Sequence, residues 1–340
     1  MDQLLEVTNL STQFKTEEKI AFAVRQVNLS IKPGETIGIV GESGSGKSVT
    51  ARSIMRIVEN QGGQITSGEI LLEGDDLVKK TEKQMRNIRG NMISMIFQDP
   101  MTSLNPLIKV GEQIAEVLRY HKNYSKQQAR AETIRIMQDM SIPSAEKRYG
   151  QYPHEFSGGM LQRLMIAIAL ACKPKLLIAD EPTTALDVTI QAQILRLMKQ
   201  LQTQYNMSIL LITHDLGVVA QVCDRVSVMY AGEIVESADV ATLFEEPLHP
   251  YTWGLIESIP RLGQRKGSLQ PIQGAPPKLT EEMIGCSFAK RCPYKSTRCE
   301  QQKPVLERLR PAHAVACHHA DELVKRKGDP GWKNYSRLSN

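Results

Sequence analysis

A glycine-rich stretch with one lysine has the spacing of a phosphate-binding loop. Residues 41–48 read Gly-Glu-Ser-Gly-Ser-Gly-Lys-Ser, between the apolar residues 36–40 and a helical pattern at 48–54. Glycines let backbone N–H groups converge on an anion, and Lys47 can reach the β- and γ-phosphates of a nucleoside triphosphate. This context argues against a flexible glycine turn with a stray lysine. The predicted ATP-binding residues are Gly41, Ser43, Gly44, Ser45, Gly46, Lys47, Ser48 and Val49.

Two adjacent acids end a second apolar run, Leu-Leu-Ile-Ala at 176–179. Burying neighbouring carboxylates is costly unless a cation or a proton transfer uses them. Asp180 is suited to hold Mg²⁺ together with the Ser48 hydroxyl, and Glu181 to polarise a water for attack on the γ-phosphate. His214 follows the apolar run 209–213 and can donate a hydrogen bond to the γ-phosphate, although one histidine at a strand end is usually structural.

Other polar and aromatic positions give weaker signals. Gln98 ends the predicted strand 92–97, where it can ligate Mg²⁺ and orient the attacking water. Phe14 lies on a predicted loop between the first two strands, where it can stack on adenine or pack in the core. Ser157 begins an apolar helix, and the free N–H groups of Gly158 and Gly159 make its start a second anion site, although an ordinary capped helix would look similar. Asp187 is expected to cap the following helix.

The elements that position these residues alternate between strands and helices. Short strands are expected within residues 4–40, at 68–72, at 92–97 and at 176–179, and a helical insertion from 106 to about 149 separates two halves of an α/β core. A strand at 209–213, a helix at 216–222 and strands at 225–230 and 233–236 close that core.

Composition and charge limit the protein class. The chain has 340 residues, no apolar run long enough to span a membrane, and no basic and apolar leader at its start, so a cytosolic location is expected. Residues 261–340 carry 16 Lys and Arg against 7 Asp and Glu, whereas the rest carries 26 against 30. This basic segment can face an anionic lipid surface or an acidic partner, or can simply be solvated. Six cysteines in a cytosolic protein are unsuited to disulfides, and Cys172 and Cys223 are expected to be core residues.

The motifs together resemble the ATP-binding subunits of ABC transporters. They are GESGSGKS, the Gln98 loop, SGGMLQR, LLIADE, TALD and ITHD, in that order. The resemblance implies a P-loop ATPase domain at 1–245, with a RecA-like core, an antiparallel β subdomain and a helical subdomain at about 100–170. Only 109 positions separate Ser48 from Ser157, which argues against the coiled-coil relatives that act on DNA, so no nucleic-acid partner is expected. Met160 stands where many members carry Gln.

The resemblance also implies residue roles. In that family two domains close head to tail, and each ATP lies between one phosphate-binding loop and the other subunit's SGG helix. The implied catalytic residues are Glu181, His214 and Gln98, and the implied Mg²⁺ ligands are Ser48, Gln98 and Asp180. The residues that would serve the partner's ATP are Ser157, Gly158, Gly159 and Gln162, with Asp187 in the D-loop. One set of motifs implies pairing with a second ATPase.

The C-terminal part narrows the resemblance. Leu-His-Pro-Tyr-Thr-Trp-Gly-Leu at 248–255, Ser-Ile-Pro at 258–260 and Gly-Ala-Pro-Pro at 274–277 look like the extension of oligopeptide and dipeptide importer ATPases. This implies an external peptide-binding protein, two permeases and a related but different second ATPase, with the chain peripheral at the cytoplasmic face of the membrane. One alternative is the same type of ATPase serving the uptake of nickel or a metal chelate. A less favoured alternative is a soluble ATPase that does not take part in transport.

The predicted extension covers residues 246–325, and a basic tail follows at 326–340. Four cysteines cluster within the extension, namely Cys286, Cys292, Cys299 and Cys317. Their spacing is looser than that of usual zinc pairs, whereas a [4Fe–4S] cluster accepts it, and Lys290, Arg291 and Arg298 would offset its charge. The resemblance likewise implies a [4Fe–4S] cluster, with zinc or four free thiols as alternatives. A structural role is expected for the cluster, because nothing nearby suggests electron transfer. His313, His318 and His319 are expected to be bystanders, and only His313 could support the site from behind its ligands.

Overall fold

The computed structural model describes residues 3–15, 19–99, 103–184, 187–259, 272–280 and 283–325. Parts of two predicted motifs, Ala185-Leu186 and Pro260, and the basic tail lie outside these ranges. All six cysteines lie within them and are free thiols.

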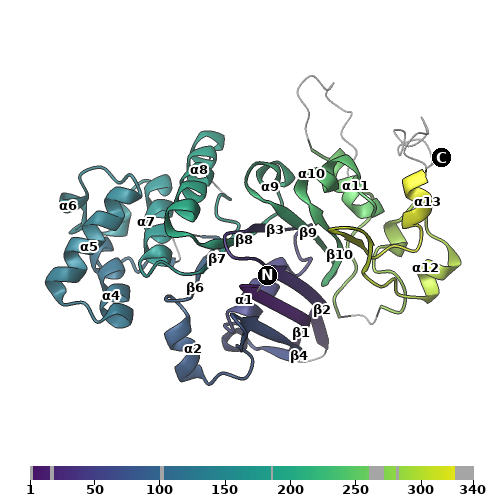
Figure 1. The fold of residues 1–340 in the computed structure, drawn as a ribbon, viewed down its shortest axis with the longest axis horizontal. Helices are drawn as coiled ribbons and strands as arrows, with labels where there is room; N and C mark the ends of the chain where they lie inside the picture. Colours follow the sequence, from purple (N-terminus) through teal and green to yellow (C-terminus); the bar gives the residue numbers. More distant parts are fainter. Residues whose placement is uncertain are drawn as a thin grey trace.

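A central eight-stranded sheet carries strands from both ends of the chain (Figure 1). Its order is β11-β12-β10-β9-β3-β8-β7-β6, with β9, β3, β8, β7 and β6 parallel and β10, β12 and β11 added antiparallel. The strands are β3 (Thr36–Val40), β6 (Ile93–Ile96), β7 (Leu176–Asp180), β8 (Ser208–Thr213), β9 (Arg225–Tyr230), β10 (Glu233–Asp239), β11 (Glu307–Arg310) and β12 (His313–Val315). Every residue of β3, β7 and β8 is buried, as expected for parallel strands covered on both faces.

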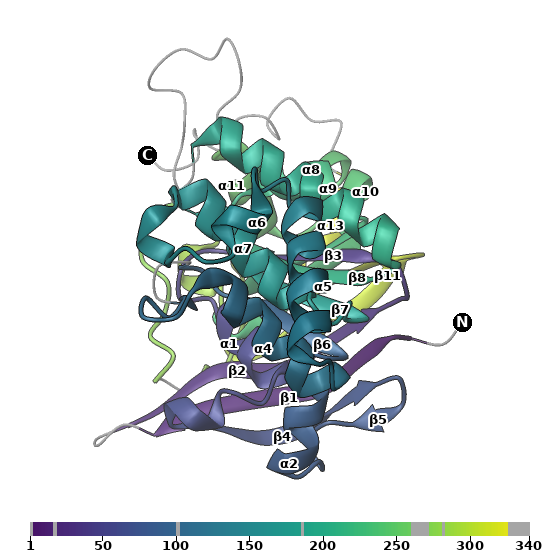
Figure 2. The ribbon, with the colours of Figure 1, turned by 90° about the vertical axis from the view of Figure 1, so that its left-hand side faces the viewer.

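A four-stranded antiparallel sheet lies below the central sheet in Figures 1 and 2. Its order is β2-β1-β4-β5, from β1 (Leu5–Lys15), β2 (Ile20–Ile31), β4 (Gly63–Leu72) and β5 (Asp75–Asp76). Leu5, Leu10 and Ile31 from this sheet share one buried core with Ile37 and Ile39 of β3. The two sheets are therefore held together by apolar packing.

Phe14 does not lie on a loop, so that prediction was wrong. It belongs to β1, where it pairs with Ala21 of β2 and Gly63 of β4. A side chain at position 63 would approach the Phe14 ring to 2.9 Å. The strand continues to Lys15 because both neighbouring strands extend alongside it.

A helical lobe occupies the left of Figure 1 and faces the viewer in Figure 2. It contains α4 (Val110–Lys122), α5 (Lys126–Asp139), α6 (Ala145–Arg148) and α7 (Gly158–Leu170). Ser125 begins α5 with a capping box, because its side chain accepts from the Gln128 N–H and the Gln128 side chain accepts from the Ser125 N–H. The predicted helical insertion is confirmed and resolves into separate helices that share one core.

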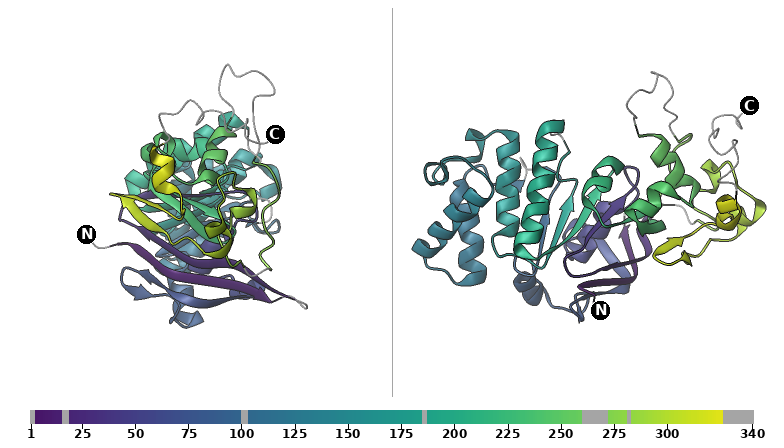
Figure 3. Two further views of the ribbon diagram at one scale, coloured as in Figure 1. Left: turned by 90° about the vertical axis from the view of Figure 1, so that its right-hand side faces the viewer. Right: turned by 45° about the horizontal axis from the view of Figure 1, so that its top comes forward.

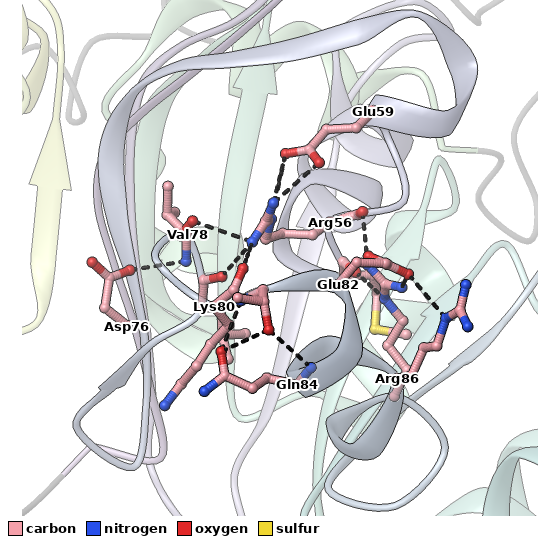
Figure 4. A network of polar contacts seen from close by, with 12 residues as sticks. Arg56, Glu59, Asp76, Val78, Lys80, Glu82, Gln84 and Arg86 are labelled. Atoms are coloured by element: carbon pink, nitrogen blue, oxygen red, sulfur yellow. Dashed lines mark hydrogen bonds and ion pairs between the residues drawn. The ribbon is translucent and has the colours of Figure 1, made fainter.

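The remaining helices of the core are α1 (Lys47–Ile54), α2 (Glu82–Ile88), α8 (Val188–Tyr205), α9 (Leu216–Val222) and α10 (Val240–Glu245). Arg56, just after α1, binds the segment between β5 and α2 (Figure 4). Its guanidinium donates to the carbonyls of Leu77 at 3.1 Å and Val78 at 3.2 Å, and pairs with Glu59. These contacts fix the end of the helix that follows the phosphate-binding loop.

The C-terminal segment packs against the antiparallel end of the central sheet (Figure 3). It contains α11 (Pro250–Glu257), a 3₁₀ turn at Ala289–Arg291, α12 (Thr297–Gln301) and α13 (Ala320–Lys325). Its hairpin β11–β12 extends the sheet of the predicted ATPase domain, so the two parts share a sheet as well as a core. Among the described residues, no helix combines the length and the hydropathy needed to cross a bilayer.

One buried carboxylate joins this segment to the sheet. Glu236 of β10 accepts hydrogen bonds from the backbone N–H groups of Leu248 at 2.6 Å and His249 at 3.0 Å, and from His313 Nε2 at 2.8 Å. Glu236 and His313 are both fully buried. Because a buried carboxylate needs such donors, Glu236 fixes both the start of α11 and strand β12.

Candidate functional site

The phosphate-binding loop joins β3 to α1. Gly41, Gly44 and Gly46 have positive φ angles of 155°, 78° and 105°. A Cβ atom at Gly41 would lie 2.1 Å from the Met229 carbonyl oxygen, and one at Gly46 would lie 2.4 Å from that of Ala23. These two glycines are therefore required by the neighbouring backbone, whereas Gly44 and the exposed Ser43 border open space.

Lys47 folds back over this loop. Its Nζ donates to the carbonyls of Gly41 at 2.8 Å and Glu42 at 2.9 Å, and lies 3.4 Å from Ser45 Oγ. Burial lowers the pKa of Lys47, against the opposing effect of nearby carboxylates. The ammonium group is thus held at the centre of the loop, where a phosphate group would supply the negative charge that carbonyl oxygens lack.

Ser48 and Asp180 meet beside the loop, at the ends of different elements. Ser48 Oγ donates to Asp180 Oδ1 at 2.8 Å, and Asp180 is 1% exposed. Its second oxygen, Oδ2, is buried without a hydrogen-bond partner among the described residues, and burial raises the pKa of Asp180. A hydroxyl next to an unpartnered carboxylate oxygen provides the oxygen donors that Mg²⁺ prefers, so these two residues fit a Mg²⁺ site. Val49 instead packs against the core that the two sheets share.

Glu181 is held by side chains from three other positions. Its Oε2 accepts from Thr184 Oγ1 at 2.8 Å and Gln98 Nε2 at 3.1 Å, and its Oε1 lies 3.1 Å from His214 Nδ1. Its φ angle of 47° is rare for a non-glycine residue, and such strain concentrates at active sites. Burial favours a raised pKa, but the hydrogen bonds from His214 and Thr184 outweigh it and leave the pKa of Glu181 lowered.

Gln98 therefore lies with the predicted base rather than with the predicted Mg²⁺ ligands. Its contact in the described structure is to Glu181, while Ser48 and Asp180 contact each other. The structure thus brings together two of the three expected Mg²⁺ ligands. His214 has a 60% exposed side chain, so its ring is accessible from solvent.

The start of α7 lies away from the phosphate-binding loop. Ser157 occupies the N-cap position, but its side chain makes no capping hydrogen bond, and Ser157 and Gly158 are exposed. In Figure 1, α7 belongs to the helical lobe and α1 to the centre of the molecule. No hydrogen bond or ion pair among the described residues joins 157–159 to the loop, so the structure does not bring these two predicted anion sites together within one chain.

The base of α7 is nevertheless joined to the segment after Glu181. Gln162 is buried and donates to the Pro182 carbonyl at 2.6 Å. Gly159 faces Ile190 of α8, and a Cβ at Gly159 would lie 3.1 Å from that side chain. Asp187 caps α8 by accepting from the Ile190 N–H at 2.9 Å, as predicted. A shift of α7 would therefore move the backbone next to Glu181.

Sequence reasoning missed three residues that hold the site. Thr184 donates a hydrogen bond to Glu181. Its position three residues after Glu181 in the sequence was the one signal that could have indicated this contact. Tyr251 and Arg291 contact Glu42 of the phosphate-binding loop from positions 209 and 249 residues away. No local pattern connects residues at that separation.

The four clustered cysteines line one small cavity. Cys286 donates its backbone N–H to the Cys299 carbonyl at 2.8 Å, which brings two of them together. Burial raises the pKa of Cys286 to about 11 and the pKa values of Cys292 and Cys317 to about 12. Four thiols, that of Cys299 on α12 and the other three on segments between elements, thus converge on a largely apolar space.

The surroundings of this cavity differ from the prediction. His318 and His319 are part of its lining, so they are not bystanders by position, whereas His313 is bonded to Glu236 instead. Among the residues that the structure describes, no Lys or Arg lines the cavity, and Arg291 points to Glu42. Within the described ranges, no three His, Cys, Asp or Glu side chains are grouped closely enough for a single metal ion. The iron–sulfur cluster therefore stays a prediction.

Comparison with known proteins gives matches over both parts of the chain. A family described as ABC transporter matches residues 24–184, and one described as the oligopeptide/dipeptide transporter C-terminal region matches residues 235–299. The oligopeptide transport ATP-binding protein AppD of Bacillus subtilis is 53% identical over 322 residues, which cover 95% of this chain and 98% of AppD. The dipeptide transport ATP-binding protein DppD of the same organism is 50% identical over 325 residues, covering 96% and 97%.

A solved structure shares the fold. The dimeric ATP-binding cassette MJ0796, bound to ADP and phosphate, matches with a TM-score of 0.63 and 28% identity. The match covers 69% of this chain and 98% of that structure. The chain therefore belongs to the ABC transporter family, among the ATP-binding proteins that carry the oligopeptide/dipeptide transporter C-terminal region.

Proposed function

We propose that this chain hydrolyses ATP to drive the import of oligopeptides or dipeptides across a membrane. The observation that carries the proposal is the arrangement of Glu181, an ionised carboxylate held by Gln98, Thr184 and His214 beside the phosphate-binding loop. The names of AppD and DppD support peptide cargo. They favour peptides over the metal chelates that the sequence left open.

The site residues divide the reaction between them. Lys47 and the loop N–H groups bind the β- and γ-phosphates, and a Mg²⁺ held by Ser48 and Asp180 would neutralise phosphate charge. Glu181 accepts a proton from water as that water attacks the γ-phosphorus, and the bond to the β–γ bridging oxygen breaks to give ADP and phosphate. His214 keeps the carboxylate in place and lies at the exposed edge, where it can donate to the γ-phosphate.

The exposed start of α7 supports a partner ATPase. Ser157 and Gly158 form an exposed helix N-terminus, at which the Ser157 hydroxyl makes no capping hydrogen bond. This helix end lies away from the phosphate-binding loop of the same chain. Such a helix end suits an anion, so it would bind the ATP of a second, related subunit, with the two subunits closing head to tail. The full assembly would add two permeases and an external peptide-binding protein, and this chain would be peripheral at the inner membrane face.

Glu181→Gln tests the proposal directly. The amide cannot accept the proton, so turnover should fall by about 10²–10⁴-fold while ATP still binds. Glu73→Gln, which changes an exposed ion pair with Lys175, is the matched control and should hydrolyse ATP normally. The ATPase assembly used for this measurement should have no other active ATP site. Normal turnover in Glu181→Gln would remove Glu181 from the role of base.

We also propose that Cys286, Cys292, Cys299 and Cys317 hold a [4Fe–4S] cluster in a structural role. Support comes from the convergence of the four cysteines on one small, largely apolar cavity. Iron, sulfide and zinc content of protein purified without air, with a visible spectrum, tests this. About four irons and absorption near ~400 nm are expected. One zinc, or no metal, would contradict the cluster and leave the ATPase proposal standing.

A further inference from the structure

The cysteine-bearing segment contacts the phosphate-binding loop through one ion pair. Arg291 Nη1 lies 2.7 Å from Glu42 Oε2, and Arg291 Nη2 lies 3.0 Å from Glu42 Oε1. The Arg291 side chain is 5% exposed and that of Glu42 is 27% exposed. Two parallel charge-assisted bonds in a mostly buried place are among the stronger polar contacts in proteins, and they fix orientation as well as distance.

Arg291 has almost no freedom to leave this position. Its Nε donates to the Gln273 carbonyl at 2.9 Å, and its Nη2 also donates to the Ile272 carbonyl at 3.1 Å. Its guanidinium lies over the rings of Tyr230 at 5.7 Å and Phe288 at 5.9 Å from their centroids. The arginine is therefore a rigid support for the loop, because each of its three nitrogens donates a hydrogen bond.

A second contact reaches the same loop residue. The Glu42 backbone N–H donates to Tyr251 Oη at 2.8 Å, and Tyr251 is fully buried. The carbonyl of Glu42 in turn accepts from Lys47 Nζ at 2.9 Å. Glu42 is thus bound on its side chain by Arg291, on its N–H by Tyr251 and on its carbonyl by the lysine that would bind phosphate.

The backbone turn that carries Arg291 lies between two of the clustered cysteines, Cys286 and Cys292. The 3₁₀ turn Ala289–Arg291 is closed by bonds from the Ala289 N–H to the Cys286 carbonyl at 3.0 Å and from the Cys292 N–H to the Ala289 carbonyl at 3.3 Å. A displacement of Cys286 or Cys292 would therefore move the backbone that carries Arg291. Phosphate-loop geometry and cysteine-site geometry are mechanically joined.

We propose that Arg291 and Tyr251 are positioning residues of the phosphate-binding loop, through which the C-terminal cysteine segment sets the ATP affinity of the site. The inference rests on ATP binding, as in the proposed function, but not on the presence of a metal cluster. Arg291 and Tyr251 act through Glu42 and touch no phosphate themselves. The segment is accordingly part of the nucleotide site as well as an appendage.

The primary test compares Arg291→Met with Arg298→Met in the full-length chain. Arg298 lies on the same segment, next to Cys299, but contacts Gln302 instead of the loop. Titration with a fluorescent ATP analogue and Mg²⁺ should show about fivefold or greater weakening for Arg291→Met, the scale of an ordinary coupling between sites, and no change for Arg298→Met. In the assembled ATPase, the KM for ATP should rise more than kcat falls.

If Arg291→Met does not fold, a change of its partner Glu42 in the phosphate-binding loop provides the same test. Glu42→Gln removes the charge that Arg291 binds and leaves the C-terminal segment unaltered, so it should weaken ATP binding similarly. Because the two residues act as one pair, the double variant should be no weaker than either single variant. Fully additive losses would overturn the proposal.

A reciprocal readout separates positioning from stability alone. ATP should slow amide deuterium exchange in residues 286–292 of the wild type, since coupling between two sites acts in both directions, and this protection should vanish in Arg291→Met. A folded Arg291→Met protein with wild-type ATP affinity would contradict the inference and leave the proposed function intact. A wild-type chain that binds no ATP would instead contradict the proposed function.

Discussion

The nucleotide site and the cysteine cavity are built in opposite ways. The nucleotide site consists of polar side chains at the ends of buried parallel strands and on the loop that follows β3, and their contacts to one another are short and specific. The cysteine cavity is lined by thiols, aromatic rings and histidines from short helices and the loops between them. Glu236 helps to attach it to the sheet, together with the pairing of β12 with β10, and Arg291 and Tyr251 attach it to the nucleotide site.

This difference shows where each region is vulnerable. The nucleotide site is supported by a sheet, so a change there should alter binding or chemistry and leave the fold unaffected. The cavity has little regular structure around it, so a change there should first alter stability. The following predictions test that division.

The largest expected effect is that of Glu236→Ala. The change leaves two backbone N–H groups and His313 buried without an acceptor, so the free energy of unfolding of the C-terminal segment should fall by about 3–5 kcal/mol. Urea unfolding followed by Trp253 fluorescence would measure it. Glu307→Ala, an exposed position on β11, is the control, and an equal loss in both variants would refute the special role of Glu236.

Lys47→Ala should instead leave stability nearly unchanged and strongly weaken ATP binding. Loss of a charge-assisted contact to phosphate should cost about 3 kcal/mol, roughly a hundredfold in Kd. Calorimetric titration with ATP and Mg²⁺ would measure this, beside Lys175→Ala, whose lysine contacts Glu73 on the surface. Unchanged affinity in Lys47→Ala would overturn the phosphate-loop assignment.

Cys292→Ser and Cys172→Ser compare a clustered thiol with a buried thiol that lies next to the Val117 carbonyl of α4. Both changes bring a hydroxyl into an apolar place, but the loss of a cluster ligand should also release metal. The Tm of Cys292→Ser should therefore fall by about 5 °C more than that of Cys172→Ser. Equal shifts in the two melting curves would favour free thiols.

The smallest expected effect is that of Thr184→Val. The change removes one of the hydrogen bonds that lower the pKa of Glu181 and hold its carboxylate. A loss of about 1 kcal/mol, or roughly fivefold in kcat, is expected, with ATP affinity unchanged. Thr203→Val, at an exposed position of α8, serves as the control in the same ATPase assay, and equal rates for both variants would show that Thr184 does not position the base.

How much of this could be predicted from the sequence depends on how far apart the cooperating residues are. Lys47, Ser48, Asp180, Glu181 and His214 each end or follow an apolar strand, and the parallel sheet brings those strand ends together. That geometry follows from local pattern and topology. Asp187 was likewise predictable because helix capping is local.

Contacts that depend on tertiary packing were not predictable. Phe14 was expected on a loop between the first two strands, but pairing with β2 and β4 places it within β1. Arg291 was expected to offset charge near the cysteines, but a carboxylate 249 residues away binds it. The pairing of His313 with Glu236 spans 77 residues and also has no local signal.

Peptide uptake by the reconstituted transporter tests the central claim most directly. Proteoliposomes would contain the complete assembly with the partner ATPase's own site inactivated, and would be supplied with ATP, a binding protein and a labelled peptide. We predict ATP-dependent uptake with wild-type chain and its loss with Glu181→Gln at unchanged ATP affinity. Peptide uptake that continues at the wild-type rate with Glu181→Gln would contradict the claim that this chain powers import.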